Sequence, residues 1–522
     1  MMSKKWVSVL LVIVTAAFLL AGCGKNDSHS AAKEKIVVAQ SSDAMYLDPQ
    51  VIDDGSTNSI LCNIYDGLVN RQADLSIVPG LAEKWEQKDD LTWIFYLRKN
   101  VVFHNEKAFT ADDVVFTIDR LKKQKVVSGF ARGIANVRKI DDYTVEIKTP
   151  TPYPILPNDL VKVRIINKEY VTQVGNETFN QKPVGTGPYK VTEWIKEDHL
   201  TLQANEKYWK GSPQIKAVIF RPISNEATRT AALLSGEVDV IADVPVRDAE
   251  RIEKDSKLKL VREPSLRLIY LILDIGRDRT PAVDLPKNPF QDERVRQAAR
   301  LGIDIDSIIK NVMNGRAYPA EQGNPKEVIG YVSGLQAVKY DPEKANALLA
   351  EAGYPNGFTV TLDAPNNRYP NDSKVAEAIA SQWAKIGINV KLNLMPKALY
   401  FDYTRLADKT TVSLIGWTSE NADAGFWYRA FFYSKDKKPG YGTSNRSFYT
   451  NPEFDNYIDQ SDSTARLNER AQFLQQATRQ LQKDLPLLPL YFQENAYGFS
   501  KRINFTPRKD EYIYAFDIQW SK

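Results

Sequence analysis

Short apolar runs alternate with helix-spaced apolar positions along most of the chain. Residues 36–39 and 91–97 are runs of aliphatic, β-branched or aromatic side chains, which predict buried strands. Residues 145–148 alternate between apolar and polar side chains, which predicts a half-exposed strand. Apolar residues recur at helical spacing over 111–121, where Thr110 precedes them as an N-cap and two aspartates occupy the positive first turn. The first half of the chain therefore mixes strands and helices.

The second half repeats this mixture. The pattern predicts helices over residues 292–309, 341–352 and 374–386, the second of which starts at an Asp-Pro cap. It predicts strands over residues 358–362 and 388–394. Strands and helices interleaved in both halves indicate α/β layers. A body of about 500 residues exceeds the ~250–300 at which one core stops growing, so we expect two lobes, intimately connected because no Pro-rich linker separates them.

The N-terminal apolar run indicates export. Residues 6–20 carry no charge and follow two lysines, and the run is short for a membrane span, which needs ~20 apolar residues. Leu20-Ala21-Gly22-Cys23 resembles the lipobox of bacterial lipoproteins. That resemblance implies removal of residues 1–22 and diacylation of Cys23, followed by a flexible polar tether over 23–35. The alternative is an ordinary signal peptide with an incidental cysteine.

Charge and cysteine content narrow the function classes. The formal net charge is +4, and it falls to +2 when residues 1–22 are removed, because that segment holds Lys4, Lys5 and no acid. A nearly balanced chain gives no electrostatic reason to expect nucleic acid as a partner. Cys62 is the only cysteine besides Cys23, so with Cys23 lipidated we expect no disulfide.

Motifs for common catalytic chemistries are missing from the sequence. His29, His104 and His199 are too far apart for a helical ligand pair, and the chain has no Cys-x-x-Cys, Gly-x-Ser-x-Gly or phosphate-loop motif. Residues 185–188 are glycine-rich, but Pro188 removes an amide donor that a phosphate cradle would need. A hydrolase that uses a pair of carboxylates stays an alternative, because many Asp and Glu residues are available. We expect a protein that is not an enzyme and has no cofactor.

Several short blocks are distributed over the mature chain. They are PGLAEKW (79–85), Leu97-Arg98 with VFH (102–104), FTADDVV (109–115), PVGTGPY (183–189), Asn205 with Tyr208-Trp209, ATR (227–229), SGEVD (235–239), VRQA (295–298), YDPEKA (340–345), NPEFD (451–455) and LLPLY (487–491). Each block is weak alone. In their order and spacing, however, they resemble the dipeptide- and oligopeptide-binding lipoproteins of bacterial ABC importers, a large family of extracellular solute-binding proteins.

The resemblance implies a bilobal α/β periplasmic-binding-protein fold of the large peptide-binding type. The first lobe would cover residues 36–268 and include an extra sub-domain at about 70–185. The second lobe would cover residues 269–492, and residues 493–522 would return to the first lobe. Such a receptor closes on its ligand by hinge motion.

Residues 416–423 are the best candidate for ligand recognition. They follow an apolar run at a strand end, where polar residues commonly face a ligand crevice. The family's peptide binders have a Trp here and, three residues later, an Asp that pairs with the peptide α-ammonium. Trp417 matches this pattern, whereas position 420 is Glu, so Glu420 keeps the charge and adds a methylene. We include Gly416, Thr418 and Asp423 in the candidate site; the alternative is that both acids are solvated loop residues.

The other end of a short peptide is a carboxylate, which suits the planar fork of an arginine. Arg368 lies between the predicted strand 358–362 and the helix 374–386, and dipeptide-binding relatives place a carboxylate-binding Arg in this loop. The spacing to the helix differs by about one residue, so an ordinary loop cation is the alternative.

The predicted function is capture of short peptides, from dipeptides to oligopeptides, outside the cytoplasmic membrane and their delivery to an ABC permease complex. The protein would act as a monomer that is lipid-anchored to the outer face of that membrane or to the periplasmic side of a membrane. One alternative is a receptor for another small solute, such as a metal chelate, haem or glutathione. A surface hydrolase is the alternative from another class.

Overall fold

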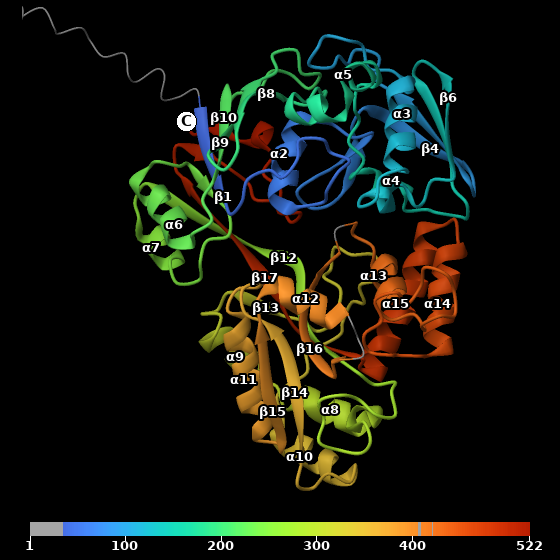
Figure 1. Ribbon diagram of the computed structural model, residues 1–522, viewed down its shortest axis with the longest axis vertical. Helices are drawn as coiled ribbons and strands as arrows, with labels where there is room; N and C mark the ends of the chain where they lie inside the picture. The colour runs from blue at the N-terminus through green and yellow to red at the C-terminus, as the bar shows by residue number, and fades with distance from the viewer. Residues whose placement is uncertain (1–34, 406–408, 420) are drawn as a thin grey trace, which may run out of the picture.

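The computed structural model describes residues 35–405, 409–419 and 421–522. The predicted signal segment 1–22, Cys23, most of the predicted tether 23–35 and Glu420 lie outside the described residues. The described chain forms an upper and a lower lobe, connected by two long strands (Figure 1). No helix of the described chain is long and apolar enough to span a membrane.

One mixed sheet of eleven strands runs through both lobes. Its order is β15-β14-β16-β12-β17-β11-β1-β10-β9-β8, and β13 also pairs with β17. The strands are β1 (Lys35–Gln40), β8 (Tyr189–Ile195), β9 (His199–Ala204), β10 (Ala217–Pro222), β11 (Val240–Ile241), β12 (Leu258–Leu273), β13 (Ala317–Pro319), β14 (Phe358–Pro365), β15 (Ile388–Met395), β16 (Val412–Thr418) and β17 (Leu487–Ser500).

The antiparallel strands β12 and β17 connect the two lobes. β17 pairs with β11 of the upper lobe near its end, while β12 pairs with β16 of the lower lobe. The register between β12 and β17 shifts between Pro264 and Leu268, which interrupts regular pairing where the chain passes from one lobe to the other. A bend at this irregularity would change the angle between the lobes.

The upper lobe contains a sub-domain with its own sheet and core. The sheet has the order β4-β5-β7-β6, and α3 packs on it around buried residues such as Phe95, Val114 and Ile147 (Figure 1). The elements are β4 (Ala82–Asp89), β5 (Thr92–Leu97), β6 (Asn136–Asp141), β7 (Thr144–Lys148), α3 (Ala111–Leu121) and α4 (Leu156–Leu160). The remaining upper-lobe elements are α2 (Gly55–Ile64), β2 (Val69–Arg71), β3 (Ile77–Pro79), α5 (Lys168–Gln181), α6 (Glu226–Ser235), α7 (Ala249–Lys254), β18 (Ile503–Asn504) and β19 (Gln519–Trp520).

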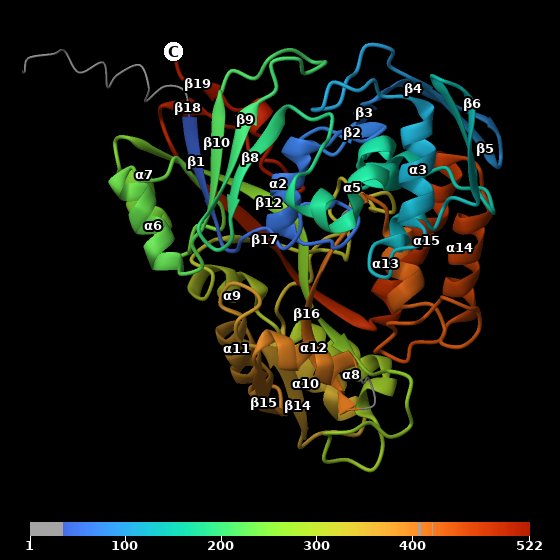
Figure 2. The ribbon, with the colours of Figure 1, turned by 45° about the horizontal axis from the view of Figure 1, so that its top comes forward.

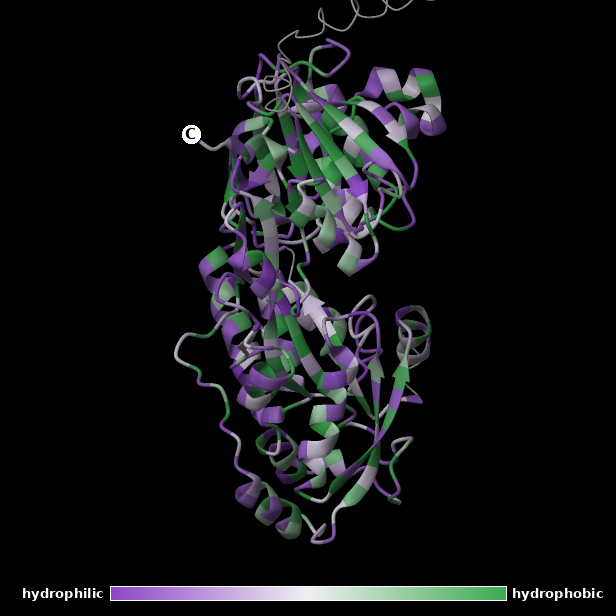
Figure 3. Ribbon diagram, turned by 90° about the vertical axis from the view of Figure 1, so that its left-hand side faces the viewer, coloured by the Kyte–Doolittle hydropathy of each residue, from purple (hydrophilic) through white to green (hydrophobic). Residues whose placement is uncertain are grey.

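The lower lobe packs helices on both faces of its part of the sheet, around two clusters of buried side chains. One cluster joins α8–α11 to the sheet, and the other joins α13–α15 to the opposite face. Figure 3 shows hydrophobic colour concentrated along the strands that these helices cover. The helices are α8 (Glu293–Leu301), α9 (Ile305–Asn311), α10 (Pro342–Glu351), α11 (Asp372–Ala384), α12 (Lys397–Arg405), α13 (Ala424–Phe431), α14 (Pro452–Ser463) and α15 (Leu467–Asp484).

Most of the predicted elements are confirmed, and one is wrong. α3 begins after Thr110, where Thr110 and Asp113 form a capping box. The single helix predicted over 292–309 is two helices, because α8 ends at Gly302 and α9 starts at a new cap, where Ser307 N donates to the Asp304 carboxylate at 2.8 Å. Apolar periodicity continues through this break, so the pattern alone did not show it.

Candidate functional site

An aromatic wall stands at the carboxyl end of β16, where α/β sheets commonly bind ligands. Trp417 lies one residue before the end of this strand, opposite Leu268 of β12. Its ring lies 4.9 Å from that of Phe431, and it stacks at 6.3 Å on Trp427, centroid to centroid. Its indole Nε1 is buried without a hydrogen-bond partner in the described chain, so this wall offers an apolar face and an unused donor.

Gly416 makes room for a neighbouring tyrosine. A Cβ at this position would lie 2.7 Å from the ring of Tyr369, closer than real Cβ contacts. Gly416 N donates to Tyr369 Oη at 2.8 Å, which fixes the ring against β16. Tyr369 directly follows Arg368, so the structure brings together two sequence-predicted site residues, Gly416 and Arg368, through a residue that the sequence did not single out.

Arg368 is half-buried in the loop after β14, and in the described chain its guanidinium has no hydrogen bond or ion pair. It lies 5.0 Å from the ring centroid of Tyr369, while its backbone N donates to the Asp372 carboxylate at 2.8 Å. Burial lowers the pKa of Arg368, and the charge of Arg267 lowers it further. Arg267 lies 3.7 Å from Glu511 of the C-terminal return. Two guanidiniums thus lie near each other beside the carboxyl end of β16.

Asp423 has a structural role instead of a free carboxylate. Its oxygens accept from Arg470 Nε at 2.8 Å and Nη2 at 2.7 Å, and both side chains are fully buried. The same carboxylate caps α13, because Gly425 N donates to it at 2.8 Å. The expectation that Asp423 faces the ligand is therefore not supported by its geometry, and we leave it out of the proposed ligand contacts.

The loop after Trp417 contacts the upper lobe. Asn421 Nδ2 donates to the Asp159 carboxylate at 3.3 Å, and Asn158 Nδ2 donates to the Asn421 carbonyl at 3.0 Å. Burial raises the pKa of Asp159, which also accepts from Tyr153. Thr418 Oγ1 is buried without a hydrogen-bond partner among the described residues. Glu420, one residue before Asn421, lies outside the described residues. Sequence reasoning missed the residues on the upper-lobe side, because no motif marks them.

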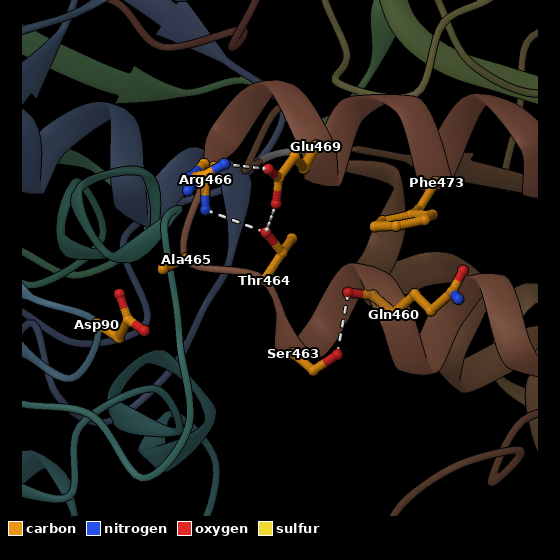
Figure 4. A pocket seen from close by; sticks show the side chains of 8 residues that line it. All are labelled: Asp90, Gln460, Ser463, Thr464, Ala465, Arg466, Glu469 and Phe473. Atoms are coloured by element: carbon orange, nitrogen blue, oxygen red, sulfur yellow. Dashed lines mark hydrogen bonds and ion pairs between the residues drawn. The ribbon is translucent and has the colours of Figure 1, made fainter.

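A polar groove lies between the sub-domain and the lower lobe (Figure 4). It has a volume of about 370 Å³ and runs between Asp90, on the turn from β4 to β5, and the segment that joins α14 to α15. Arg466 pairs with Glu469 at 2.7 Å on its lower-lobe side. No group of His, Cys, Asp and Glu side chains in the described chain is arranged to hold a metal ion.

Two α/β lobes that are joined by two long strands are the architecture of a solute-binding receptor that closes on its ligand. The chain belongs to the family of bacterial extracellular solute-binding proteins, family 5, whose model matches residues 76–439. It is 31% identical to the dipeptide-binding protein of Escherichia coli over 84% of this chain and 86% of that protein. It is 29% identical to heme-binding protein A of Haemophilus influenzae over 96% of each.

Solved structures also match the fold. The ABC transporter-associated periplasmic binding protein DppA of Helicobacter pylori, in complex with the peptide STSA, superposes with a TM-score of 0.75 at 27% identity. The match covers 94% of this chain and 100% of that structure. The bilobal α/β fold predicted from the sequence is confirmed.

Proposed function

We propose that this protein captures short peptides outside the cytoplasmic membrane and delivers them to an ABC permease. The observation that carries the proposal is Arg368, a half-buried guanidinium beside Tyr369 and Gly416 that has no ion pair in the described chain. A buried charge needs a paired group of opposite sign, and a peptide C-terminal carboxylate supplies one. Relatives named for dipeptide or peptide binding support this choice.

The two ends of the peptide would meet opposite charges. Arg368 would hold the carboxylate, and Glu420 would pair with the α-ammonium, while the Trp417 ring packs against the peptide between them. Binding is non-covalent, so the proposal requires no catalytic group and no cofactor. We further propose that the protein works as a monomer.

Closure of the lobes would complete the site. We propose lobe boundaries at residues 36–268 and 269–492, with a sub-domain at about 70–185 and a return over 493–522. The interrupted pairing between Pro264 and Leu268 supports a hinge at this point. A ligand that contacts both lobes favours the closed state by its differential affinity for it.

Replacing Arg368 with lysine is expected to weaken binding of free-carboxylate peptides more than that of their C-terminal amides. The lysine keeps the charge but loses the bidentate fork. Calorimetry of matched acid and amide peptides measures this difference. Arg466→Lys, in the polar groove between the sub-domain and the lower lobe, is the control that should leave the difference unchanged. Equal losses for acids and amides would argue that Arg368 does not meet the carboxylate.

A second candidate ligand is another anionic solute, such as haem, glutathione or a chelate. The pair of guanidiniums, Arg267 and Arg368, favours it, as does the relative named for heme binding. Mass spectrometry of what co-purifies with the protein separates the candidates: intact peptides support the peptide receptor, while haem, glutathione or a chelate supports the alternative. Turnover of a supplied substrate would instead favour a hydrolase.

We also propose that Cys23 carries the lipid that anchors the protein to the outer face of the membrane. Cys23→Ser is expected to abolish the acyl attachment and release the folded body as soluble protein, because a diacyl anchor supplies the membrane affinity. Detergent partitioning and intact-mass measurement check this, with Cys62→Ser as the matched control that keeps the lipid. A Cys23→Ser protein that still carries acyl chains would refute the assignment.

A further inference from the structure

A row of polar side chains crosses the lower-lobe sheet on the face next to α12. Asn393 of β15 pairs with Asp363 of β14, and Asp363 pairs with Ser413 of β16. Paired residues of adjacent strands project to the same face, so these three side chains lie side by side. Tyr400 of α12 donates to the Leu414 carbonyl of β16 at 2.6 Å, next to Ser413, and α12 also contacts β14, so this helix lies over the row (Figure 2).

Two members of this row have unused hydrogen-bonding atoms. Asp363 and Ser413 are each 1% exposed, and Asp363 Oδ2 and Ser413 Oγ have no hydrogen-bond partner in the described chain. Only the other Asp363 oxygen is used, accepting from Asn393 Nδ2 at 2.8 Å. A buried polar atom without a partner destabilises the fold, and the cost is larger when the group is charged. Such atoms in a native fold call for an explanation.

No cation of the described chain compensates Asp363. Burial raises its pKa to about 6, and only the hydrogen bond from Asn393 opposes that rise. Arg446, which donates to Thr404 of α12 at 3.0 Å, is a nearby guanidinium, but it makes no hydrogen bond or ion pair with Asp363 in the described chain. The Asp363 carboxylate therefore lacks a positively charged partner within the described chain, and a cation from outside the protein could pair with it.

Asp363 lies near the carboxyl end of β14, close in the chain to the loop that holds Arg368. β14 ends at Pro365, two residues beyond Asp363, and Arg368 follows in the loop. At about 3.3 Å per residue, Asp363 is about 7 Å below the carboxyl end of the strand. A lysine side chain has a four-carbon stem between its backbone and its ammonium, which suits this depth.

We propose that Asp363 and Ser413 form a side-chain pocket beneath α12 that binds a basic side chain of the captured peptide. The ammonium donates to Asp363 Oδ2 and Ser413 Oγ, while the rings of Tyr400 and Tyr270 flank its aliphatic stem. This inference rests on the proposed peptide function and adds a substrate preference to it: peptides that carry lysine or a similar cation.

Calorimetry with tripeptides that differ at one side chain tests the proposal. Alanine tripeptides carrying lysine at each position in turn are compared with the same peptides carrying norleucine, which has a similar length and no charge. At one position, lysine is expected to bind about thirty-fold more tightly than norleucine, as for a close buried charge pair. Asp363→Asn should reduce the ratio of lysine-peptide to norleucine-peptide affinity to about two or less and leave the norleucine affinity nearly unchanged. Ser413→Ala should reduce the same ratio partly.

Asp455→Asn is the matched control. Asp455 is also 1% exposed in the lower lobe, but it accepts from Ser434 N at 3.0 Å and Lys437 Nζ at 2.9 Å. This variant should lower the Tm and keep the lysine preference. Asp363→Asn should leave the Tm of the free protein unchanged or raise it, because it removes an unpaired buried charge.

The outcomes separate this inference from the proposed function. A lysine-to-norleucine ratio near one at every position, or a ratio that Asp363→Asn does not change, overturns the pocket while peptide binding stands. A large Tm loss in Asp363→Asn together with loss of all peptide binding would show a structural acid and also overturn it. If no peptide binds, the proposed function fails. In that case the small cations cadaverine and agmatine test the site alone: a rise in the Tm of the wild type, but not of Asp363→Asn, would support the cation site. No rise in the Tm of the wild type would overturn both the peptide function and the cation site.

Discussion

Replacing Asp423 with alanine is expected to lower the free energy of unfolding by about 3–5 kcal/mol, because it removes the bidentate carboxylate that pairs with a buried guanidinium. Arg470 is fully buried and donates two hydrogen bonds to Asp423, which also caps α13. Arg470 retains contacts with the Ser461 carbonyl and with Asp462, but neither replaces the bidentate carboxylate. Urea unfolding followed by circular dichroism measures the loss.

A double-mutant cycle sharpens this expectation. Arg470→Leu alone should also destabilise the lower lobe, and the Asp423→Ala, Arg470→Leu double variant should lose less than the sum of the two, since the second change removes the orphaned charge. The exposed pair of Glu250 and Lys254, 2.6 Å apart on α7, is the control, and its disruption should cost less than about 1 kcal/mol. Additive losses at Asp423 and Arg470 would contradict the assigned coupling.

The helices that the sequence predicted well have strong local signals. α10 starts where an Asp-Pro cap was predicted, with Lys344 N donating to Asp341 at 2.9 Å, and α3 starts at its predicted threonine cap. Capping depends on residues within one turn of each other, so a sequence pattern contains it. The single helix predicted over 292–309 shows the limit of periodicity. The apolar positions keep their spacing, although α8 ends at Leu301 with Gly302 as its C-cap and α9 starts after Asp304.

The candidate site was predictable in its location but not in the roles of its acids. Gly416 and Trp417 do lie at a strand end, yet Glu420 and Asp423 occupy the same polar run and looked equivalent. The structural role of Asp423 comes from its pairing with Arg470, which lies 47 residues later in the chain and on another helix. Contacts over such separations are set by tertiary packing and leave no local pattern in one sequence.

The same reason hides the upper-lobe side of the crevice and the row beneath α12. Asp159 contacts Asn421 across 262 residues, and Asp363 of β14 lies opposite Ser413 of β16, an adjacent strand from a separate segment of the chain. An aspartate inside an apolar strand gives a weak hint, since a buried acid requires a partner. Only the fold shows that the partner is missing within the described chain.

Replacing Glu420 with glutamine is expected to weaken binding of free peptides by about 2–5 kcal/mol, or roughly thirty-fold or more, because it removes the charge that would pair with the α-ammonium and nearly preserves the shape. An N-acetylated peptide should lose comparable affinity for the wild type, since acetylation removes the same charge pair from the ligand side. The acetylated peptide should lose much less additional affinity for Glu420→Gln, where the pair is already broken.

Calorimetry of the wild type and Glu420→Gln, each with the free and the N-acetylated peptide, measures the coupling energy between Glu420 and the ligand ammonium directly. Glu469→Gln is the matched control, because Glu469 lies at the groove mouth and pairs with Arg466, so this variant should bind free and acetylated peptides in the wild-type ratio. If the wild type binds acetylated and free peptides equally well, Glu420 does not meet the ammonium. The two guanidiniums at Arg267 and Arg368 would then make an anionic solute the better ligand, because their end of the crevice does not depend on a ligand cation.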